Sequence, residues 1–394
     1  VVACSRVLCT QTVFSAKTMA LLAMSAVLFL VIRPVIRRLL GFLEPALRKL
    51  AEAQVRFVDE MPGRWIALAI VGSACGSLAL ELAVIRWQGT IWEIFAFYKN
   101  FSLLACFAGL GLGYALAKQD RIPLVLTIPL LALQMLLFVA MRYGMVLWML
   151  TSLKATPVTE QLNMGIVVST GAPHLIAIYT FLAAVMMLTA LAFVPVGQIC
   201  GRLMTRTQTL KAYGYNLGGS ILGTLLVMVL SLLWTPPVVW MIPCFAILLL
   251  LQKYSSRAIA IGALFSLTAI LALDWPVSSL SERIYSPYQL LERGAGRNGL
   301  TTIIAAGHYY QHIHDLSPKA VAAYPDRRPV RDYYDLPYRV HAKPRRVAVV
   351  GAGTGNDVAA ALRRGAEHVD AIEIDPAIMS IGATYHPEGP YQDK

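Results

Sequence analysis

The sequence predicts a multi-span α-helical membrane domain followed by a smaller α/β domain. Of the 394 residues, 57% are hydrophobic and only 14% are charged, and the mean hydropathy is +0.61. This composition is typical of membrane proteins. The long apolar runs end near residue 274, after which short β-branched runs alternate with turns that contain Gly or Pro.

The charge distribution separates the same two parts of the chain. Residues 1–274 hold 20 Lys and Arg against 9 Asp and Glu, whereas residues 275–394 hold 14 against 13. The basic excess therefore lies among the hydrophobic runs, where positive connections set membrane topology. Although the net charge is +12, we expect no nucleic-acid partner.

The sequence predicts neither disulfides nor a metal site. All six cysteines precede residue 245 and none forms a CxxC pair, so we expect small, buried apolar side chains. His308, His312 and His314 share one face of an expected strand, but no acid or Cys has the even spacing that would place it on the same face. We therefore expect these histidines to face solvent or to line a pocket rather than to bind a metal.

About eight apolar runs are long enough, or nearly so, to be membrane spans. Glycines repeat at short intervals in two of them, at 109–113 and 218–223, which predicts close helix packing. The runs cover roughly residues 13–32, 65–85, 101–117, 122–141, 174–197, 213–234, 238–251 and 258–273.

The segment 33–64 has apolar residues at helical spacing opposite basic ones. It predicts an amphipathic helix on an anionic membrane surface, broken in two near Pro45. A solvated helical linker is the alternative. We accordingly divide the chain into four parts: an N-terminal span with this helix (1–64), a multi-span domain (65–274), a small β subdomain with a linker (275–340) and a cofactor-binding domain (341–394). Within the third part, residues 300–316 predict a β-hairpin and the Pro- and Arg-rich residues 318–331 predict a loop.

Three polar residues in the spans need an explanation. Glu81 lies deep in a span, with Arg86 near the end of the same span. We expect a structural pair that reaches the interface, and a functional intramembrane site is the alternative. Asn216 is expected to hydrogen-bond a neighbouring helix.

A strand, a glycine turn and a helix follow one another near the end of the chain. The apolar run 347–350 predicts a buried parallel strand. Gly351, Gly353 and Gly355 follow at once, and glycines let the backbone turn sharply and lie against a ligand. Residues 357–364 then have helical composition.

A second strand is expected over 369–374, and it carries Glu373 about twenty residues after the first glycines. An acid at this position can accept both hydroxyls of a ribose. The spacing departs from the dinucleotide fingerprint, because Asn356 stands where the third glycine belongs. We therefore expect the first half of a Rossmann-like domain for an S-adenosylmethionine-type cofactor, with a ligand-free βαβ unit as the alternative.

Five short motifs accompany this unit in the C-terminal part: Ser286-Pro-Tyr-Gln289, Gly307-His-Tyr-Tyr-Gln311, Tyr333-Tyr-Asp335, Val350-Gly-Ala-Gly-Thr-Gly-Asn-Asp357 and Ile372-Glu-Ile-Asp375. In this order they resemble the spermidine synthase (polyamine aminopropyltransferase) family, and in particular its bacterial members fused to a multi-span membrane domain. The membrane stretches 76–86, 108–114 and 212–223 are similar to the membrane segments of that fused group. The likeness covers most of residues 65–394.

The resemblance implies roles for individual residues. Cofactor-binding roles fall on Gln289, Gly351, Gly353, Thr354, Gly355 and Glu373, and polyamine-pocket roles fall on Tyr333, Tyr334 and Asp335. Three positions depart from the family pattern: Thr354 replaces an Asp, Tyr334 a His and Asp335 a Glu. The proton-accepting Asp of the family is expected beyond Lys394, so we expect no turnover from residues 1–394 alone.

The resemblance implies a membrane-bound transferase that moves an aminopropyl group from decarboxylated S-adenosylmethionine to a polyamine, without a metal. Thr354 makes an S-adenosylmethionine-dependent methyltransferase the first alternative. A membrane transport or scaffold protein with a degenerate nucleotide-fold sensor domain is the second. The expected partners are the lipid bilayer of the bacterial inner membrane and a small polyamine, with self-association left open.

The expected topology conflicts with a cytosolic cofactor. With eight spans, the basic stretches 33–64, 118–121, 198–212 and 253–257 share one side, which should be cytoplasmic. The same count places residues 275–394 on the other side. We expect a miscounted span, within 142–173 or 238–273, rather than an outward-facing soluble part.

Overall fold

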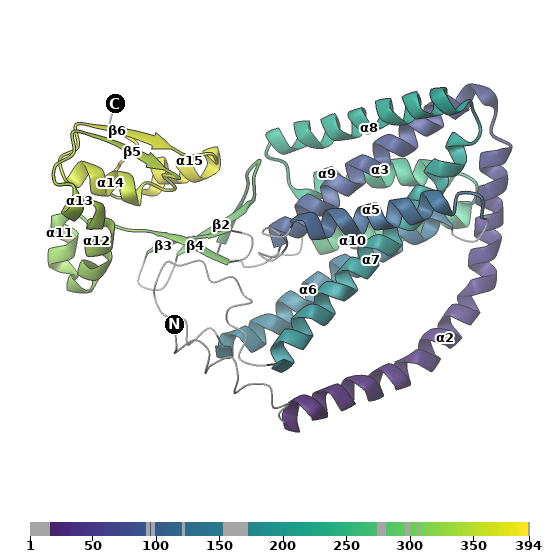
Figure 1. The fold of residues 1–394 in the computed structure, drawn as a ribbon, viewed down its shortest axis with the longest axis horizontal. Helices are drawn as coiled ribbons and strands as arrows, with labels where there is room; N and C mark the ends of the chain where they lie inside the picture. Colours follow the sequence, from purple (N-terminus) through teal and green to yellow (C-terminus); the bar gives the residue numbers. More distant parts are fainter. Residues whose placement is uncertain are drawn as a thin grey trace, which may run out of the picture.

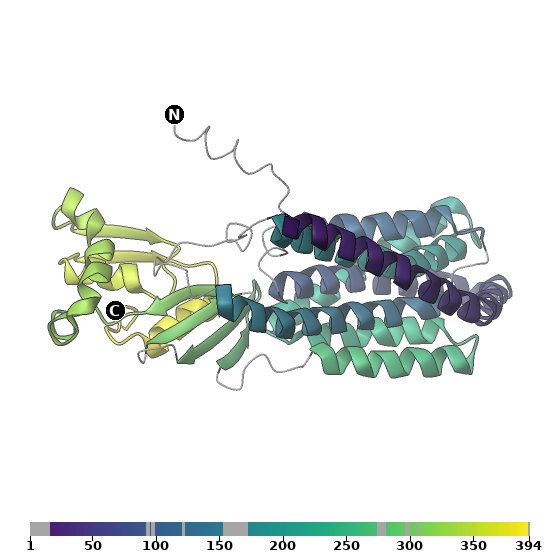
Figure 2. The ribbon, with the colours of Figure 1, turned by 90° about the horizontal axis from the view of Figure 1, so that it is seen from below.

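The computed structural model describes residues 16–91, 95, 99–119, 123–152, 172–273, 281–295, 300–305 and 308–392. A bundle of long helices forms one end of the molecule, and a smaller part with both strands and helices forms the other (Figure 1). Figure 2 shows the bundle helices running roughly along the long axis of the molecule, with the strand-containing part beyond their ends.

The N-terminal helix α2, Ala16–Asp59, is continuous over 44 residues through Pro34 and Pro45. The predicted break at Pro45 is therefore wrong, because each proline removes only one main-chain hydrogen bond and bends a helix that neighbouring turns continue. Figure 1 shows α2 curving around the outside of the bundle. Its last turns dock there, since Val58 is buried and Gln54 Oε1 accepts from Leu124 N at 2.6 Å.

Within the described residues, seven further helices form the bundle, with the short 3₁₀ helix η1 before α6: α3 (Gly63–Ile91), α5 (Lys99–Ala115), η1 (Leu124–Leu126), α6 (Thr127–Ser152), α7 (Ala172–Met204), α8 (Thr209–Leu232), α9 (Pro237–Leu251) and α10 (Ser256–Leu273). Among the described residues, four helical stretches are long and apolar enough to cross a membrane: Gly63–Thr90, Phe181–Met204, Thr209–Leu232 and Ser256–Leu273. Three shorter apolar helices accompany them, at Asn100–Ala115, Leu124–Val139 and Pro237–Leu251. These helices are consistent with a membrane protein.

Helix α6 continues to Ser152, well past the end predicted near residue 141. The rest of the mixed segment 142–173 lies almost wholly outside the described residues, as does the start of the first expected span. The predicted hydrogen bond of Asn216 is confirmed, because Tyr114 of α5 donates to its Oδ1 at 3.4 Å.

The predicted pair of Glu81 and Arg86 is wrong. Five residues along an α-helix correspond to about 140° of rotation, so the two side chains leave α3 in different directions. Arg86 instead places its guanidinium 4.2 Å from the Trp240 ring and donates to Ser286 O at 2.7 Å. Glu81 is buried in the bundle and forms no ion pair within the described part of the chain.

Close helix packing is confirmed for those glycines of each run that face a neighbouring helix. A Cβ atom at Gly219 would clash with Val71 O, and one at Gly109 would clash with Ala190 O. These glycines let α8 approach α3 and let α5 approach α7. Their neighbours Gly111 and Gly218 face open space.

The basic connections lie at the end of the bundle remote from the strands. Figure 1 shows the turns after α7 and α9 at this end, together with the turn from α2 into α3. Arg202 and Arg206 lie here, and Arg202 pairs with Asp59 at 2.6 Å. The structure thus keeps the predicted separation of the basic connections from residues 281–392. Of the two ranges in which a miscounted span was expected, 238–273 forms the two helices that were counted, α9 and α10, and 142–173 includes residues outside the described part.

Four antiparallel strands form the sheet next to the bundle, in chain order: β1 (Ser281–Tyr285), β2 (Leu290–Ala295), β3 (Thr301–Ala305) and β4 (His308–Ile313). The predicted hairpin at 300–316 is confirmed as β3–β4, and the sheet is larger than predicted. Leu291, Ile303 and Ile313 form its core with apolar residues of α15 (Pro376–Tyr385). Residues 274–280, which contain the predicted domain boundary, lie outside the described residues.

Short helices replace the loop predicted at 318–331: α11 (Pro318–Ala323), η4 (Pro325–Arg327), α12 (Arg328–Tyr334) and α13 (Leu336–Val340). The loop prediction is wrong because the prolines stand at the first turns of these helices, where a missing N–H costs nothing. Ser317 also caps α11, since its Oγ accepts from Ala320 N at 3.2 Å.

The strand–turn–helix–strand order is confirmed by β5 (Arg346–Val350), α14 (Asn356–Arg363) and β6 (His368–Ile372), with β5 and β6 parallel. The predicted full burial of β5 is wrong, because its residues alternate between exposed and half-buried and Val350 is 81% exposed. Helix α14 contacts both strands and covers one face of the pair. A two-stranded sheet does not establish the Rossmann-like fold, which stays a prediction.

We expect Gly219→Leu to destabilise the bundle, because the new side chain would force α8 away from Val71 of α3. Overpacking of this kind costs about 1–3 kcal/mol, and the melting temperature in detergent should fall. The measurement is the reaction of a thiol-specific dye with the bundle cysteines, which are free and mostly buried, during heating.

Gly218→Leu is the matched control, because a Cβ atom there meets nothing within 4 Å. Its melting temperature should equal that of the wild type. Equal melting of both variants would contradict the close contact between α3 and α8.

Candidate functional site

The glycine turn, residues 351–355, connects β5 to α14 and crosses the carboxyl end of β6. Gly351 N and Ala352 N both donate to Ile372 O, at 2.8 and 3.0 Å. Gly351, Gly353 and Gly355 have φ angles of 75°, 58° and 100°, in the left-handed region that side chains disfavour. The three glycines are therefore required by the path of the backbone.

Glu373 joins the end of β6 to this turn. Its Oε2 accepts from Gly353 N at 2.8 Å, and its Oε1 accepts from Asp375 N at 2.9 Å. Each carboxylate oxygen has two lone pairs, so each can accept one further hydrogen bond from a ligand. Glu373 is half-buried, which leaves part of the carboxylate accessible.

Gln311 of β4 is a contact residue of the glycine turn that the sequence analysis did not assign. Its Oε1 accepts from Thr354 N at 3.2 Å and from Thr354 Oγ1 at 3.0 Å. The available signal was its place at the end of the Gly307–Gln311 motif. Thr354 is completely buried, so its hydroxyl serves the packing of the turn against β4.

Tyrosine and carboxylate side chains surround the glycine turn. Tyr391 Oη donates to Gly353 O at 2.9 Å. Burial raises the pKa of Tyr391 to about 12, and the charges of Glu373 and Asp357 add to this rise. Burial also raises the pKa of Tyr310, with a contribution from Glu373. The environment of the turn is therefore aromatic and acidic.

Gln289 lies in the turn between β1 and β2, which the fold brings to the carboxyl end of β6. Ser286 N donates to Gln289 O at 3.0 Å and closes this turn. Ser286 Oγ donates to Asp375 Oδ2 at 2.7 Å, two residues after Glu373. The structure thus brings the Gln289 turn and the glycine turn to the same strand end, and the Gln289 side chain is half-buried there.

Tyr333, Tyr334 and Asp335, in contrast, lie in three different environments. Tyr333 is 64% exposed, whereas Tyr334 is buried and receives a hydrogen bond from Asn356 Nδ2 at 3.1 Å. The Asp335 carboxylate is buried among three arginines: Arg331 at 3.4 Å, Arg363 at 4.0 Å and Arg364 at 2.7 Å. These cations neutralise Asp335, so it is not placed to hold a cationic polyamine in this arrangement.

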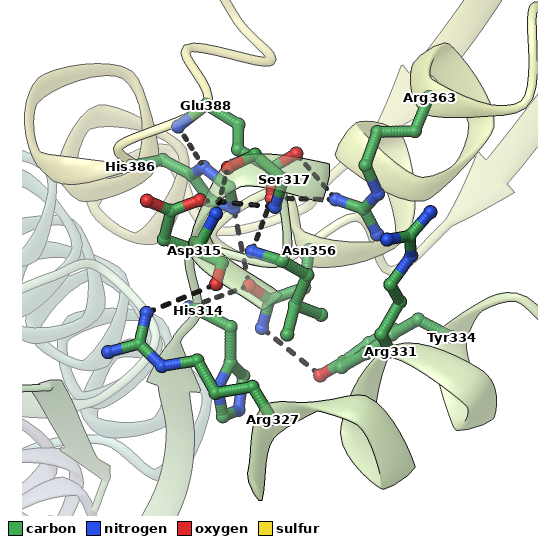
Figure 3. Close-up of polar contacts among 12 residues, drawn as sticks. His314, Asp315, Ser317, Arg327, Arg331, Tyr334, Asn356, Arg363, His386 and Glu388 are labelled. Atoms are coloured by element: carbon green, nitrogen blue, oxygen red, sulfur yellow. Dashed lines mark hydrogen bonds and ion pairs between the residues drawn. The ribbon is translucent and has the colours of Figure 1, made fainter. Parts of the chain in front are cut away.

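Asn356, the residue in place of a third glycine, has all four hydrogen-bonding positions of its buried amide occupied (Figure 3). Nδ2 donates to His312 O at 2.8 Å and to Tyr334 Oη at 3.1 Å. Oδ1 accepts from His314 N at 3.1 Å and lies 3.2 Å from His386 Nε2. The side chain therefore joins α14 to β4, to α12 and to the segment after α15.

The segment after α15 is held by charge as well. Glu388 Oε1 and Oε2 each accept from Arg363 Nη1 at 2.6 Å, and Oε1 accepts from Leu316 N at 2.9 Å. Glu388 N donates to His386 Nδ1 at 3.2 Å. Figure 3 shows the Glu388 and His386 side chains beside Asn356, with a dashed contact between Glu388 and Arg363.

The histidines of β4 take part in polar contacts. A ring nitrogen of His312 lies 3.0 Å from Thr302 Oγ1, and the buried His314 packs beside Tyr334 with ring centroids 6.2 Å apart. The His308 side chain lies outside the description. Among the described residues, no three His, Cys, Asp or Glu side chains are grouped to hold a metal ion.

Comparisons of the chain with protein-family models, with curated proteins and with solved structures give no match.

We expect Asn356→Leu to destabilise the strand-containing part. Leucine has a similar volume but leaves four buried polar partners without the amide, and each unsatisfied buried group costs about 1–3 kcal/mol. The free energy of unfolding should fall by more than 3 kcal/mol, because even three unsatisfied groups at about 1 kcal/mol each reach this value. Pulse proteolysis of the full chain in urea, read on peptides from residues 308–392, measures it.

Asn356→Asp should lose less stability, because it keeps both acceptor contacts. Glu367→Leu is the control, since the Glu367 side chain is 61% exposed and should tolerate the change. Equal stability of Asn356→Leu and the control would contradict the central role of the amide.

We expect this part to lose stability as the pH falls from about 6.5 to about 4. Burial, and then the charge of Arg363, lower the pKa of His386 to about 4, from 6.5 in the unfolded chain. Between these values the unfolded chain binds a proton that the folded chain does not, so stability decreases with decreasing pH. Asp315 opposes the shift and His314 adds to it.

The same proteolysis experiment at pH 7.5 and pH 5 measures this dependence. His386→Gln removes the titrating group, so its stability should change less between the two pH values than that of the wild type. A wild-type stability that rises on acidification would show that the pKa of His386 is not depressed.

Proposed function

We propose that the chain is a membrane-bound transferase of the spermidine synthase type. It binds a nucleoside sulfonium at the glycine turn and transfers the aminopropyl group of this cofactor to a polyamine. The observation that supports the proposal most is the contact of Glu373 with Gly353 N at 2.8 Å. This contact sets a carboxylate at the rim of a glycine turn, where it can accept ribose hydroxyls.

The charge around the turn favours a cationic nucleoside over a dinucleotide. Burial is the main cause of the raised pKa of Tyr391 and of Tyr310. The charges of Glu373 and Asp357 add to the rise at Tyr391, and those of Glu373 and Asp375 add to the rise at Tyr310, so these carboxylates all act near the turn. Carboxylates would repel a pyrophosphate, whereas they attract a sulfonium. The two tyrosine rings add faces on which a cation can lie.

The reaction that fits such a site is a displacement at carbon. The polyamine nitrogen attacks the methylene carbon next to the sulfonium and forms a C–N bond. The C–S bond breaks, its electron pair stays on sulfur, and the product is a neutral thioether. The new ammonium group gives up a proton to a base, and the site contributes by holding the nucleoside in line for attack.

Methyl transfer from S-adenosylmethionine is the second candidate, and Thr354 favours it. An Asp at this position would repel the carboxylate that ordinary S-adenosylmethionine carries and its decarboxylated form lacks. Thr354 is neutral, and its hydroxyl is already bonded to Gln311 Oε1 at 3.0 Å. Thr354 itself therefore adds no charge that would reject the carboxylated cofactor.

We expect the full chain in detergent to bind decarboxylated S-adenosylmethionine more tightly than NAD⁺, as measured by isothermal titration calorimetry. Detergent exposes both faces of the bundle, so the sidedness of the strand-containing part does not affect the result. Glu373→Ala should weaken binding about 10- to 100-fold, because hydrogen bonds to a charged group contribute about 1.5–3 kcal/mol.

Glu367→Ala is the matched control, because Glu367 is an exposed acid of the same unit, paired with Arg345 at 2.9 Å. It should bind like the wild type. Binding of S-adenosylmethionine without binding of its decarboxylated form would favour the methyltransferase over the aminopropyltransferase. Binding of neither sulfonium would remove both enzymes and leave the membrane transport or scaffold protein with a degenerate sensor domain.

A further inference from the structure

Arg86 lies near the end of α3, where this helix reaches the strands. Its guanidinium is 4.2 Å from the centre of the Trp240 ring on α9. Trp240 is 1% exposed, and its Nε1 donates to Thr235 Oγ1 at 2.9 Å, so the ring is a fixed platform. A planar guanidinium can stack on such a ring and still donate hydrogen bonds in its own plane.

Arg86 makes such a hydrogen bond to a residue outside the bundle. Arg86 Nη2 donates to Ser286 O at 2.7 Å, and Ser286 lies in the turn between β1 and β2. The other polar contact between the described bundle and this turn is longer, with Ser231 Oγ 3.5 Å from Pro287 O. Arg86 is therefore the stronger of the two tethers.

Ser286 passes the contact on to the end of β6. The residue is completely buried, and its Oγ accepts from Tyr288 N at 3.1 Å and from Gln289 N at 3.0 Å. The same hydroxyl donates to Asp375 Oδ2 at 2.7 Å. One residue thus binds a membrane arginine through its carbonyl and a buried carboxylate through its side chain.

Asp375 in turn fixes Glu373. Asp375 is 1% exposed, its Oδ1 caps α15 by accepting from Ala377 N at 3.0 Å, and its own N–H donates to Glu373 Oε1 at 2.9 Å. The other oxygen of Glu373 accepts from Gly353 N. An unbroken series of polar contacts therefore leads from Trp240 in the bundle to the glycine turn.

We propose that Arg86 is a positioning residue for the nucleoside site: through Ser286 and Asp375 it sets the Gln289 turn and the Glu373 carboxylate relative to the glycine turn. This inference rests on the proposed function, because it takes the glycine turn to be the nucleoside site. It gives the membrane bundle a part in ligand binding beyond anchoring. The site is then complete only when the β1–β2 turn is held against α3 and α9.

The test compares binding of decarboxylated S-adenosylmethionine to the full chain in lipid nanodiscs, by calorimetry, for the wild type, Arg86→Ala and Arg86→Lys. Arg86→Ala should bind about tenfold more weakly, as expected for loss of a hydrogen bond from a charged group. Arg86→Lys keeps the charge without the planar fork and should bind with intermediate affinity. An affinity of Arg86→Ala within twofold of the wild type would overturn the proposal.

Arg64→Ala is the matched control. Arg64 lies at the opposite end of α3, also beside a tryptophan, with its guanidinium 5.7 Å from the Trp65 ring. It should bind like the wild type, and a loss equal to that of Arg86→Ala would overturn the proposal. Melting of the bundle, followed with the thiol dye, separates a positioning effect from general unfolding: Arg86→Ala should weaken binding at a temperature where its bundle remains folded.

A double-variant cycle tests the route through Ser286. Ser286→Ala removes the hydroxyl that holds Asp375 but keeps the carbonyl that Arg86 contacts. If Arg86 acts through this residue, adding Arg86→Ala to Ser286→Ala should change the affinity less than twofold. If the losses of affinity of the two single variants multiply in the double variant, Arg86 does not act through Ser286.

A readout without ligand distinguishes failure of this inference from failure of the proposed function. Hydrogen exchange of the amides of Gly353 and Asp375 should be faster in Arg86→Ala than in the wild type and Arg64→Ala. Faster exchange in a protein that binds neither sulfonium would support the positioning role and refute the proposed cofactor. Unchanged exchange, with the wild type binding the sulfonium, would refute the positioning role alone.

Discussion

The four hydrogen bonds of the buried Asn356 amide are the constraint on which the strand-containing part depends. Both donors and both acceptors are used, and the partners come from β4, from α12 and from the segment after α15. A buried amide is stabilising only when every one of its positions is satisfied. This requirement fixes where β4 lies relative to α14, and hence places Gln311 against the glycine turn.

The carboxylates near Asn356 and the glycine turn are stabilised in two different ways. Asp335 is surrounded by Arg331, Arg363 and Arg364, which neutralise it and make it part of the packing between α12 and α14. Glu373 is held by two backbone N–H groups instead, and Asp375 by a backbone N–H and a hydroxyl. Such neutral donors leave the negative charge in place, so the charge near the glycine turn is available to a cationic ligand.

Four of the described bundle helices are long and apolar enough to cross a membrane, where the burial of apolar surface does not drive helices to associate. The bundle helices approach closely where glycines remove the Cβ atoms: Gly219 of α8 lies against α3, and Gly109 of α5 lies against α7. Buried polar side chains add specific links, such as Gln88 Nε2 and Gln134 Nε2, which lie 3.1 and 2.7 Å from Thr189 Oγ1. At the end near the strands, Arg86 makes a separate polar contact outside the bundle, with Ser286 O.

The sequence by itself determined the long apolar helices, the separation of basic connections from the C-terminal part, and the strand–turn–helix–strand unit with Glu373 at its end. These features are encoded locally, in hydropathy, charge and glycine spacing, and each needs only neighbouring residues to be recognised. The continuous helix through Pro45, the helices at 318–334 and the half-exposed β5 were mispredicted, because neighbouring turns, caps and sheet size override local propensity.

Only the tertiary structure decided which side chains meet. Sequence spacing suggested that Glu81 would pair with Arg86, yet helix geometry points them apart and Arg86 reaches Ser286, 200 residues away in sequence. Tyr333, Tyr334 and Asp335 are adjacent in sequence and lie in three environments. The contact of Gln311 with the glycine turn and the contacts of Asn356 with His312 and His314 depend on where β4 lies. A hydrogen bond depends on a distance in space that no local sequence pattern records.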